Sequence, residues 1–415
     1  MPARVVVVGG GAAGMLAAIA AAETGAPVVL LEKNSRLGTK VLISGKGRCN
    51  LTNAADITGL VDNIPGNGQF LYSALHTFSN KDMVALLNRL GLPTKVERGG
   101  RVFPVSDRSK DVVQALEGYL RRLGVEVRVN LPVAGLLVEG NRVTGVKAGG
   151  GTVPGKAVVV ATGGMSYPRT GSTGDGYRWA AELGHRITPL KPALVPLETN
   201  EEWVKDLQGL TLKNVEVSTW GKDSLGSEFG EMLFTHFGVS GPIILTLSRN
   251  VSRYLERHGP PVRAEINLKP ALRREQLDAR LQRDFAQFSR RQLKNSLGEL
   301  LPQRLIRVFT HLSGLPEDKF VHQITREERL HLAYLLQHLP LTVTGTRPLA
   351  EAIVTAGGVS VKEIEPQTMG SRLVRGLYFA GEVLDVDGYT GGFNLQAAFS
   401  TGFVAGKSAA AVPGD

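Results

Sequence analysis

The sequence predicts an α/β protein in which a domain built on a parallel sheet is interrupted by an insertion. Three observations predict it. Residues 1–32 read as strand, glycine-rich turn, helix and strand. Residues 376–411 read as strand, glycine-rich loop and helix. Between these two stretches, the sequence pattern changes to one typical of short strands and then to one typical of Arg-rich helices. At 415 residues, the chain is long enough for two or three domains with cores of their own.

The N-terminal stretch has the layout of a dinucleotide-binding βαβ unit. A short apolar strand, Arg4–Val8, leads into G-G-G-A-A-G at 9–14. A helical stretch follows over Met15–Glu23, and a second strand, Val28–Leu31, ends at Glu32. Because the G-x-G-x-x-G sequence lies between a strand and a helix and an acid ends the second strand, the stretch predicts a Rossmann-like site.

Each residue type in this stretch has a physical role. Gly9 permits the tight turn, Gly11 lets the backbone approach a pyrophosphate, and Gly14 lets the helix pack closely on the strand. The helix N-terminus offers free N–H groups and a partial positive charge to phosphates. Glu32 is placed to accept hydrogen bonds from ribose hydroxyls, and its charge would repel a 2′-phosphate. The site is therefore expected to hold FAD or NAD rather than NADP.

The remainder of the first domain alternates helices and strands. A polar, glycine-rich stretch over 33–53 is too long for a turn and is expected to line a ligand. The elements expected after it are a helix over Leu71–Leu90, a hairpin over Thr94–Val105, a helix over Lys110–Leu123, a strand over Val125–Val129, a hairpin of Ala134–Glu139 and Arg142–Ala148, a buried strand over Lys156–Ala161 and a helix over Tyr177–Leu183.

The pattern changes near residue 191. Short strands separated by turns predict a small antiparallel sheet or barrel, and the text over Leu272–Leu339 is helical, broken near Pro302 and Pro316. The strands expected there are Leu194–Glu198, Val215–Thr219, Met232–Phe234 and Val262–Asn267. We expect a discontinuous dinucleotide-binding domain of residues 1–190 and 345–415, a β-barrel-like region at 191–270 and a helical region at 271–344.

The C-terminal stretch indicates which dinucleotide binds. A strand over Gly376–Ala380 is followed by Gly381 and two acids, Glu382 and Asp385, which suit the hydroxyls of a ribityl chain. The last helix, Phe393–Ala411, begins after a glycine pair, and its N–H groups suit the flavin edge where negative charge develops on reduction. An NAD site would not need this second helix N-terminus, so FAD is the expected cofactor.

Five blocks of the sequence together resemble a known family. They resemble the aminoacetone-oxidase-like flavoproteins, also called the BaiN-type FAD-dependent oxidoreductases, within the glutathione-reductase-like superfamily. The blocks are V-V-V-V-G-G-G-A-A-G near the N-terminus, G-K-G-R-C-N-L-T-N at 45–53, A-T-G-G-M-S-Y-P-R-T-G-S-T-G-D-G at 161–176, M-L-F-T-H-F-G-V-S-G-P at 232–242 and A-G-E-V-L-D-V-D-G-Y-T-G-G-F-N-L-Q-A-A at 380–398. In one departure, Lys46 stands where the family usually has a third glycine.

The resemblance implies an FAD-binding domain of the glutathione-reductase type, interrupted by an inserted β-barrel and helical region. It implies that Lys40, Cys49 and Asn50 lie along the FAD and that Val133 lies near the adenine. It also implies that Asp385, Asn394 and Leu395 meet the ribityl and flavin groups. Together the motif and the resemblance give these cofactor-binding residues: Gly9, Gly11, Ala13, Gly14, Glu32, Lys33, Lys40, Cys49, Asn50, Val133, Ala161, Thr162, Gly163, Gly381, Glu382, Asp385, Gly392, Asn394 and Leu395.

Catalytic residues are less well marked, and none is required by the sequence. Arg48 could stabilise an anionic substrate or reduced flavin, or could be a structural hydrogen-bond donor. His236 and Tyr389 are candidates for proton transfer, against a purely structural role for each. Cys49 has no partner cysteine and is expected to be a packing residue. No spacing of His, Cys and acidic residues predicts a metal site.

The predicted activity is that of an FAD-dependent oxidoreductase acting on a small organic substrate. No second G-x-G-x-x-G follows a strand, so NAD(P)H is expected only as a transient reductant of the flavin. One alternative is an amine (aminoacetone-like) oxidase that uses oxygen. An alternative of another class is an FAD-containing protein that binds RNA through its Arg-rich helices.

The net charge of +10 bears on that last alternative. Between Pro270 and Thr310, nine basic residues stand against four acids. We interpret this stretch as a solvated helical face rather than a nucleic-acid site, because no recognised nucleic-acid motif or aromatic interleaving accompanies it. The single cysteine, the absence of a signal-like N-terminus and the absence of an apolar run of about 20 residues favour a cytoplasmic protein without membrane contact. The sequence leaves the oligomeric state open.

Overall fold

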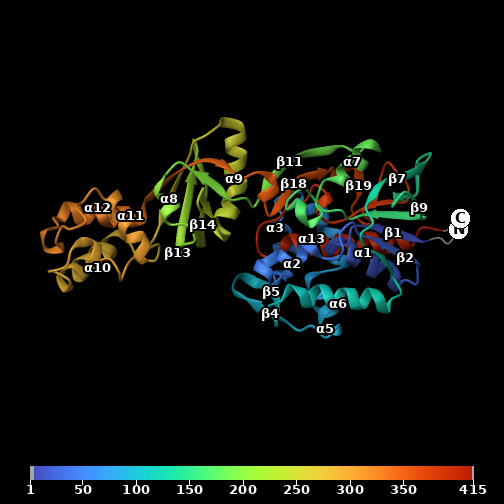
Figure 1. Ribbon diagram of the computed structural model, residues 1–415, viewed down its shortest axis with the longest axis horizontal. Helices are drawn as coiled ribbons and strands as arrows, with labels where there is room; N and C mark the ends of the chain where they lie inside the picture. Colours follow the sequence, from blue (N-terminus) through green and yellow to red (C-terminus); the bar gives the residue numbers. More distant parts are fainter. Residues whose placement is uncertain (1–3, 414–415) are drawn as a thin grey trace. The chain divides into compact units, whose positions relative to one another are not determined.

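The computed structural model describes residues 4–413 and divides into two compact units (Figure 1). The first unit joins the chain up to Ala193 with the chain from Leu349, and the second unit runs over Leu194–Pro348. An insertion therefore interrupts the first unit. No helix among residues 4–413 is both long enough and apolar enough to cross a membrane.

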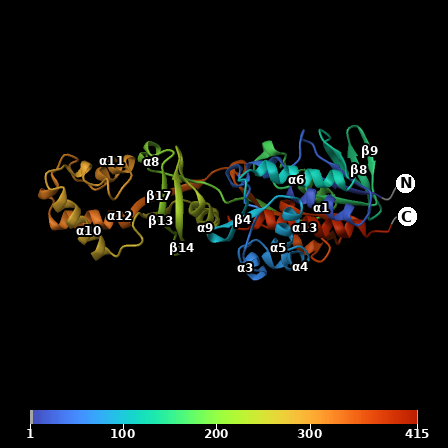
Figure 2. The ribbon, with the colours of Figure 1, turned by 90° about the horizontal axis from the view of Figure 1, so that it is seen from below.

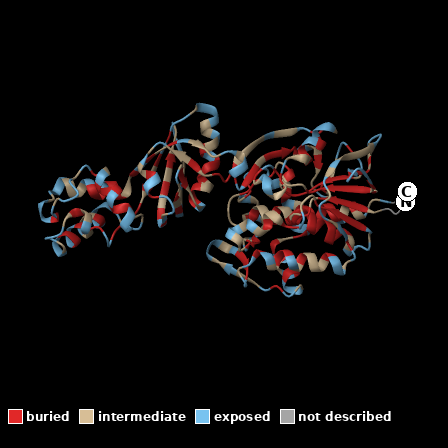
Figure 3. Ribbon diagram, in the orientation of Figure 1, coloured by how far each residue is buried: buried red, intermediate tan, exposed pale blue. Residues whose placement is uncertain are grey.

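A seven-stranded sheet forms the centre of the first unit. Its interior strand β1 (Val5–Val8) pairs in parallel with β2 (Val28–Leu31) and with the central strand β10 (Ala157–Val160), and β10 pairs in parallel with β21 (Leu377–Phe379). These runs of Val and Leu are buried throughout, as expected for parallel strands covered on both faces (Figure 3). The full order is β19 (Ile364–Glu365), β20 (Gly370–Ser371), β21, β10, β1, β2 and β6 (Glu126–Arg128).

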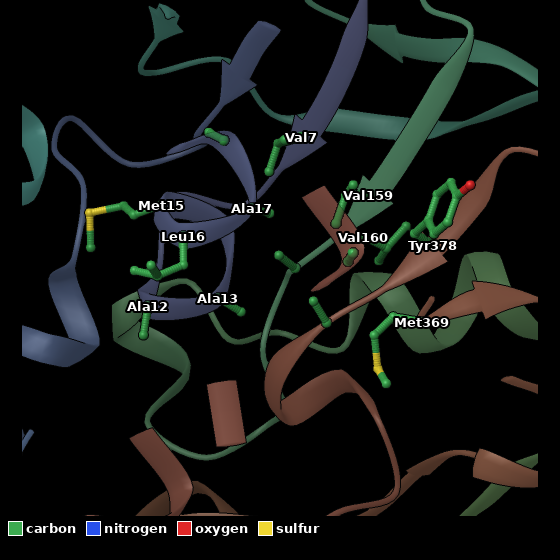
Figure 4. Close-up of a cluster of buried hydrophobic side chains, with 14 of the residues drawn as sticks. Val7, Ala12, Ala13, Met15, Leu16, Ala17, Val159, Val160, Met369 and Tyr378 are labelled. Atoms are coloured by element: carbon green, nitrogen blue, oxygen red, sulfur yellow. The ribbon is translucent and has the colours of Figure 1, made fainter. Parts of the chain in front are cut away.

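Two helices from opposite ends of the chain pack together beside this sheet. α1 (Ala12–Glu23) follows β1, and α13 (Phe393–Ala410) follows β21 (Figure 2). Their backbones approach closely because α13 carries glycines at the contact. A Cβ on Gly402 would lie 2.2 Å from the carbonyl oxygen of Ala13, so no larger residue fits there. The apolar side chains of α1, β10 and β21 form one continuous core (Figure 4).

Smaller elements complete the first unit. Two antiparallel three-stranded sheets form, β3-β5-β4 and β7-β8-β9, and β11 pairs with β18. The strands are β3 (Thr52–Asn53), β4 (Thr94–Glu97), β5 (Arg101–Pro104), β7 (Val133–Glu139), β8 (Arg142–Ala148), β9 (Gly151–Pro154), β11 (Ile187–Ala193) and β18 (Val354–Val359). The helices are α2 (Thr39–Ile43), α3 (Ile57–Asp62), α4 (Tyr72–Thr77), α5 (Asn80–Arg89), α6 (Ser109–Arg122) and α7 (Asp175–Glu182).

The helix expected over Leu71–Leu90 is two helices. Ser79 accepts a hydrogen bond from the backbone N–H of Asp82, whose carboxylate accepts one from the backbone of Ser79. This capping box starts α5 anew and ends α4 at Thr77. The stretch over 33–53 contains the short α2, and Gly45 and Lys46 in the turn after it have left-handed backbone angles.

The second unit contains a closed six-stranded barrel. Its strand order is β12, β15, β14, β13, β16 and β17, and all pairs are antiparallel. The strands are β12 (Leu197–Thr199), β13 (Thr211–Trp220), β14 (Ser224–Phe234), β15 (Gly238–Ser240), β16 (Val262–Asn267) and β17 (Leu339–Thr346). β17 closes the barrel. It agrees with the strand-like sequence pattern that begins at Leu341, although the helical region was expected to extend to residue 344.

Helices accompany the barrel in the same unit. α8 (Trp203–Asp206) and α9 (Pro242–His258) lie within the range expected to be barrel alone. α9 buries Ile243, Ile244 and Leu247 against the barrel core. A helix that the strand pattern did not predict therefore covers part of the barrel. The Arg-rich stretch forms α10 (Arg274–Gln287), α11 (Gln303–Leu312) and α12 (Arg326–Gln337), separated near Pro302 and Pro316 as expected.

Candidate functional site

The turn before α1 uses its glycines for two different purposes. Gly9 has φ +102°, and a Cβ there would lie 2.4 Å from the carbonyl oxygen of Ala161. A Cβ on Gly14 would lie 1.8 Å from the carbonyl oxygen of Gly9, so this position also excludes any side chain. A Cβ on Gly11 would meet nothing within 4 Å. Gly9 and Gly14 are therefore required by the protein itself, whereas the space beside Gly11 is open to a ligand.

The N-terminus of α1 is suited to an anion. Gly11 is the N-cap and supplies no capping side chain, and the first turn contains no acid. The first helical hydrogen bond runs from Met15 N–H to the Gly11 carbonyl, so the N–H groups of Ala12, Ala13 and Gly14 have no acceptor within the helix. Free N–H groups and the helix dipole together favour a phosphate there.

Glu32 is held in position by the backbone. The residue is 8% exposed, and its carboxylate accepts hydrogen bonds from the N–H groups of Gly10 at 2.7 Å and Asn34 at 2.8 Å. The carboxylate is thus tied to the glycine turn itself. Each oxygen keeps a further lone pair that a ribose hydroxyl could use.

The two predicted lysines are engaged in ion pairs within the first unit. Lys33 Nζ lies 2.8 Å from Asp175 at the start of α7. Lys40 Nζ contacts Glu382 at 2.7 Å and Ser166 Oγ at 2.6 Å. Lys40 and Glu382, both predicted cofactor residues, therefore bind each other and connect the N-terminal and C-terminal blocks.

The N-terminus of α13 is formed differently from that of α1. Its N-cap Gly392 has φ +99°, and a Cβ there would lie 2.3 Å from the carbonyl oxygen of Thr52. The Asn394 side chain accepts from Gly388 N–H at 2.8 Å and donates to the carbonyls of Gly388 and Tyr389 at 2.8 and 3.2 Å. The Asn394 amide therefore shapes the preceding loop. The backbone N–H groups of Phe393, Asn394 and Leu395 have no acceptor within the helix.

Several buried polar atoms of the first unit have no hydrogen-bond partner. They are Asn50 Oδ1, Thr52 Oγ1, Thr162 Oγ1 and Gln396 Oε1. Buried polar groups are nearly always satisfied, so each of these oxygens is open to a hydrogen-bond donor. Asn50 and Thr162 are both predicted cofactor residues. A dinucleotide with hydroxyl and ring N–H groups offers donors of the kind these oxygens lack, so the residues present fit FAD.

The other predicted cofactor residues lie around these features. Cys49 is fully buried, and burial raises the pKa of its thiol to about 12, so it is a neutral packing residue at physiological pH. Gly163 and Gly381 have positive φ, and Gly381 N–H donates to Thr401 Oγ1. Ala161 and Thr162 follow β10, Val133 begins β7, and Asp385 lies between Glu382 and the glycine loop.

Arg48 is occupied by other residues of the first unit. Its guanidinium bonds to Glu97 and to Asp107, 2.6 Å from Asp107 Oδ1, and lies 4.2 Å from the Phe103 ring centroid. Two carboxylates and a ring hold it, and the hydrogen bonds to the carboxylates raise the pKa of the guanidinium. These contacts favour the structural alternative for Arg48. The neighbouring Lys46 is exposed at φ +59°, a backbone conformation that favours glycine.

The other two catalytic candidates lie in different units. Tyr389 is half-buried in the loop before α13, and its N–H donates to the Asn63 carbonyl at 2.9 Å. His236 is exposed in the turn between β14 and β15 of the second unit, with its ring 4.9 Å from that of Phe237. Tyr389 lies in the loop that leads into α13, within the same unit as both helix N-termini. Among residues 4–413, no cluster of three or more His, Cys and acidic side chains could hold a metal ion.

Some residues of this site were missed by the sequence reasoning. Ser166 bridges Lys40 and Glu382, and Thr52 supports Gly392 while leaving its own hydroxyl unpaired. Both lie in blocks that had been singled out, so the signal was present. Thr355 donates its backbone N–H to Glu382 from within β18, where no motif marks it.

Comparison with known proteins adds the family context. The family model described as "HI0933-like protein Rossmann domain" matches residues 3–408. The 3-dehydro-bile acid delta(4,6)-reductase of Clostridium scindens is 32% identical over 413 residues, covering 99% of this chain and all of that protein. The ribosomal RNA dihydrouridine synthase of Escherichia coli is 32% identical over 95% of both chains, and that of Haemophilus influenzae is 30% identical over 97% of both.

Solved structures agree with the fold. A flavocytochrome c3 fumarate reductase superposes with a TM-score of 0.55 at 18% identity, covering 98% of this chain and 78% of that one. The 3-ketosteroid delta1-dehydrogenase of Sterolibacterium denitrificans gives a TM-score of 0.56 at 16% identity, covering 98% and 99%. At these identities the likeness concerns the fold alone.

Proposed function

The chain belongs to the HI0933-like family and is an FAD-dependent oxidoreductase, and from this premise we propose that it reduces a carbon–carbon double bond conjugated to a carbonyl group, with uridine in RNA as the substrate. The names of the relatives support the reaction class. One denotes the reduction of ring double bonds in a keto-steroid, and the other denotes a uridine whose ring double bond has been saturated. Both substrates carry an alkene next to a carbonyl.

The residues of the first unit suit this reaction. FAD, when bound, supplies the hydride. The chain's own part is to hold the cofactor and to supply the proton that completes the addition across the double bond. The free N–H groups at the start of α13 can stabilise negative charge that develops on the cofactor. Tyr389, in the loop that Asn394 ties to α13, is the proposed proton donor.

The proposed electron donor is NAD(P)H, bound transiently. The second unit is a barrel with helices, so it offers no dinucleotide fold of the Rossmann type. A nicotinamide would therefore have to reach the flavin and leave before the substrate binds.

One observation carries the choice of RNA over a small enone. The chain has a net charge of +10, and several exposed arginines of the second unit, Arg290 and Arg291 among them, are in no ion pair recorded among residues 4–413. Unpaired positive charges on a surface stabilise the binding of a polyanion far more than the binding of a small substrate with a single carboxylate.

The test is anaerobic stopped-flow absorbance at the flavin band. We expect NADH or NADPH to bleach the band, and a uridine-containing ribosomal RNA fragment to restore it, with a mass gain of two hydrogens on one nucleoside. A Δ4,6 keto-steroid and a primary amine with oxygen are the competing substrates. Restoration by the steroid alone, or bleaching by the amine alone, would overturn the proposal in favour of a small-molecule reductase or an oxidase.

A variant tests the proton donor separately. Tyr389→Phe is expected to slow restoration of the band by RNA about tenfold or more, while bleaching by NAD(P)H keeps its rate. Equal slowing of both half-reactions would indicate that Tyr389 supports the loop only.

A further inference from the structure

Two loops of the helical part meet to form an exposed basic and aromatic surface. One loop follows α10 and the other precedes α12. They are joined by a hydrogen bond from Val321 N–H to the Arg291 carbonyl at 3.0 Å, and by one between His322 Nδ1 and the Ser289 carbonyl at 2.8 Å. We call the side chains that they present the arginine–aromatic patch: Phe288, Arg290, Arg291, Phe320 and His322.

The rings of the patch lie close to its charges. The Arg291 guanidinium lies 4.4 Å from the centroid of the Phe288 ring. Phe320 is 40% exposed, and its ring centroid lies 5.7 Å from that of His322, which is also exposed. Phe320 thus lies exposed beside a second ring, on a loop whose backbone is hydrogen-bonded to that of Arg291. Exposing a phenylalanine ring does not stabilise the fold, so we interpret this arrangement as a surface suited to a partner.

The charges of the patch are left uncompensated, unlike others nearby. Arg280 pairs with Asp284 at 2.8 Å, and Arg329 pairs with Asp278 at 2.6 Å. Arg290 and Arg291 are exposed and have no carboxylate partner recorded among residues 4–413. The helical part therefore neutralises some arginines and leaves these two available.

Acidic residues close to the patch restrict the path that a bound polyanion can follow. Glu317 and Asp318 are exposed and lie just before Phe320, whereas Lys319 is paired with Glu328. A phosphate chain would be repelled at that end of the loop. It would be attracted at Arg290 and Arg291.

We propose that the arginine–aromatic patch is a docking surface for unpaired RNA. Bases stack on Phe320 and His322, and phosphates contact Arg290 and Arg291. Stacking on exposed rings combined with arginine contacts is how sequence-tolerant single-strand binding is achieved. The identity of the strand as substrate rests on the proposed function, but binding to the patch is measured without any reaction. An acidic protein surface would form ion pairs with the arginines but would not need the exposed rings. RNA can contact the arginines through its phosphates and the rings through its bases, so it is the occupant that we propose.

The experiment is fluorescence anisotropy of the FAD-loaded protein with a labelled RNA of about twelve nucleotides, unpaired or as a hairpin, between about 50 and 200 mM salt. We expect the unpaired strand to bind more tightly, with affinity falling as salt rises. The double variant Arg290→Glu, Arg291→Glu and the double variant Phe320→Ala, His322→Ala should each weaken binding about tenfold or more. Flavin absorbance and circular dichroism check that each variant is folded.

Arg273 and Arg274 provide a matched control. They are exposed at the start of α10, and the double variant Arg273→Glu, Arg274→Glu makes the same change in net charge away from the rings. We expect it to weaken binding less than threefold. Equal loss in this control, unchanged binding in the aromatic variant, preference for the hairpin, or displacement of RNA by polyglutamate at equal charge would overturn the proposal.

The failure of docking can be told apart from the failure of the proposed reaction. A wild-type protein that binds RNA through the patch but forms no dihydrouridine would refute the proposed function and leave the docking surface standing. Dihydrouridine formation at an unchanged rate by both patch variants, at limiting RNA, would refute docking at the patch.

Discussion

The N-termini of α1 and α13 look alike as anion sites but are held in place by different means. Each helix begins after a glycine N-cap, and neither has a capping side chain or an acid in its first turn. At α1, the glycine that a ligand would approach is surrounded by open space. At α13, the N-cap glycine is pressed against Thr52, and Asn394 clamps the loop in front of it.

The difference shows how the position of a helix N-terminus is fixed. The N-terminus of α1 belongs to one contiguous sequence motif and is held mainly by that motif. The N-terminus of α13 lies where distant segments of the chain meet, and it is held by close packing and by side-chain hydrogen bonds. The α1 turn is held within its own βαβ unit, where Gly10 N–H donates to Glu32, and it meets one distant carbonyl, that of Ala161. The α13 turn depends on β3, which is far away in sequence. Four substitutions test this contrast.

The largest expected effect is that of Gly392→Ala. The new Cβ would lie 2.3 Å from the Thr52 carbonyl oxygen at φ +99°, so either β3 or α13 must move. We expect the free energy of unfolding to fall by about 3 kcal/mol and the purified protein to lose flavin. Chemical denaturation and the flavin absorbance band measure both. A loss of less than about 1 kcal/mol would show that the contact with Thr52 yields easily.

Asn394→Ala removes the clamp but not the helix. Three hydrogen bonds to the loop disappear, and two carbonyls lose a partner. We expect a loss of about 2 kcal/mol in unfolding free energy, with flavin retained more weakly. Asn394→Asp keeps the acceptor for Gly388 N–H and removes the two donated bonds, so it separates the two contributions. If both variants unfold like the wild type, the loop is held by something other than Asn394.

Gly11→Ala tests the open end and is the matched control for Gly392→Ala. Gly11 has extended backbone angles, and its Cβ would meet nothing in the protein. We expect stability to stay within about 0.5 kcal/mol of the wild type, while FAD binds about tenfold more weakly, or about 1.4 kcal/mol. Isothermal titration of apoprotein with FAD measures this. Unchanged FAD affinity would mean that the pyrophosphate does not approach Gly11.

The smallest effect is expected for Lys46→Gly, in the turn that leads to the segment supporting α13. Lys46 is exposed at φ +59°, where an L side chain is strained. Replacement by glycine is expected to raise the unfolding free energy by about 0.5 to 1 kcal/mol, because the relief of strain exceeds the added chain entropy. Lys81→Gly, within α5, should instead lower it by a similar amount. A destabilised Lys46→Gly protein would show that the side chain makes a contact worth more than the strain.

The same contrast explains what the sequence could predict. The α1 turn, the parallel sheet, the interrupted first domain and the FAD-dependent activity follow from local patterns, because each is written within a few tens of residues. Ion pairs were not predictable, since Lys33 and Lys40 find partners more than a hundred residues away. Arg48 was left open between two roles because nothing near it in sequence reveals Glu97 and Asp107.

One local signal was overlooked. The sequence analysis did not predict α9, although this helix begins at Pro242 and proline is favourable at the first position of a helix. The pairing between the loop of Phe320 and His322 and the backbone of Arg291 could not be predicted from the sequence, because it joins two separate loops.

The pairing of Lys40 with Glu382, 342 residues apart, has a consequence for biosynthesis. The ribosome makes β1, β2 and β10 first, then the whole second unit over 194–348, and β21 and α13 afterwards. At about 5 to 20 residues per second, synthesis of the second unit alone takes roughly ten to thirty seconds. During that time the nascent sheet has an apolar edge at β10 with no neighbour, while the barrel can fold to completion. We expect slower translation to lengthen this exposure, and chaperones that shield unpaired strand edges to matter most for this protein while it is being made.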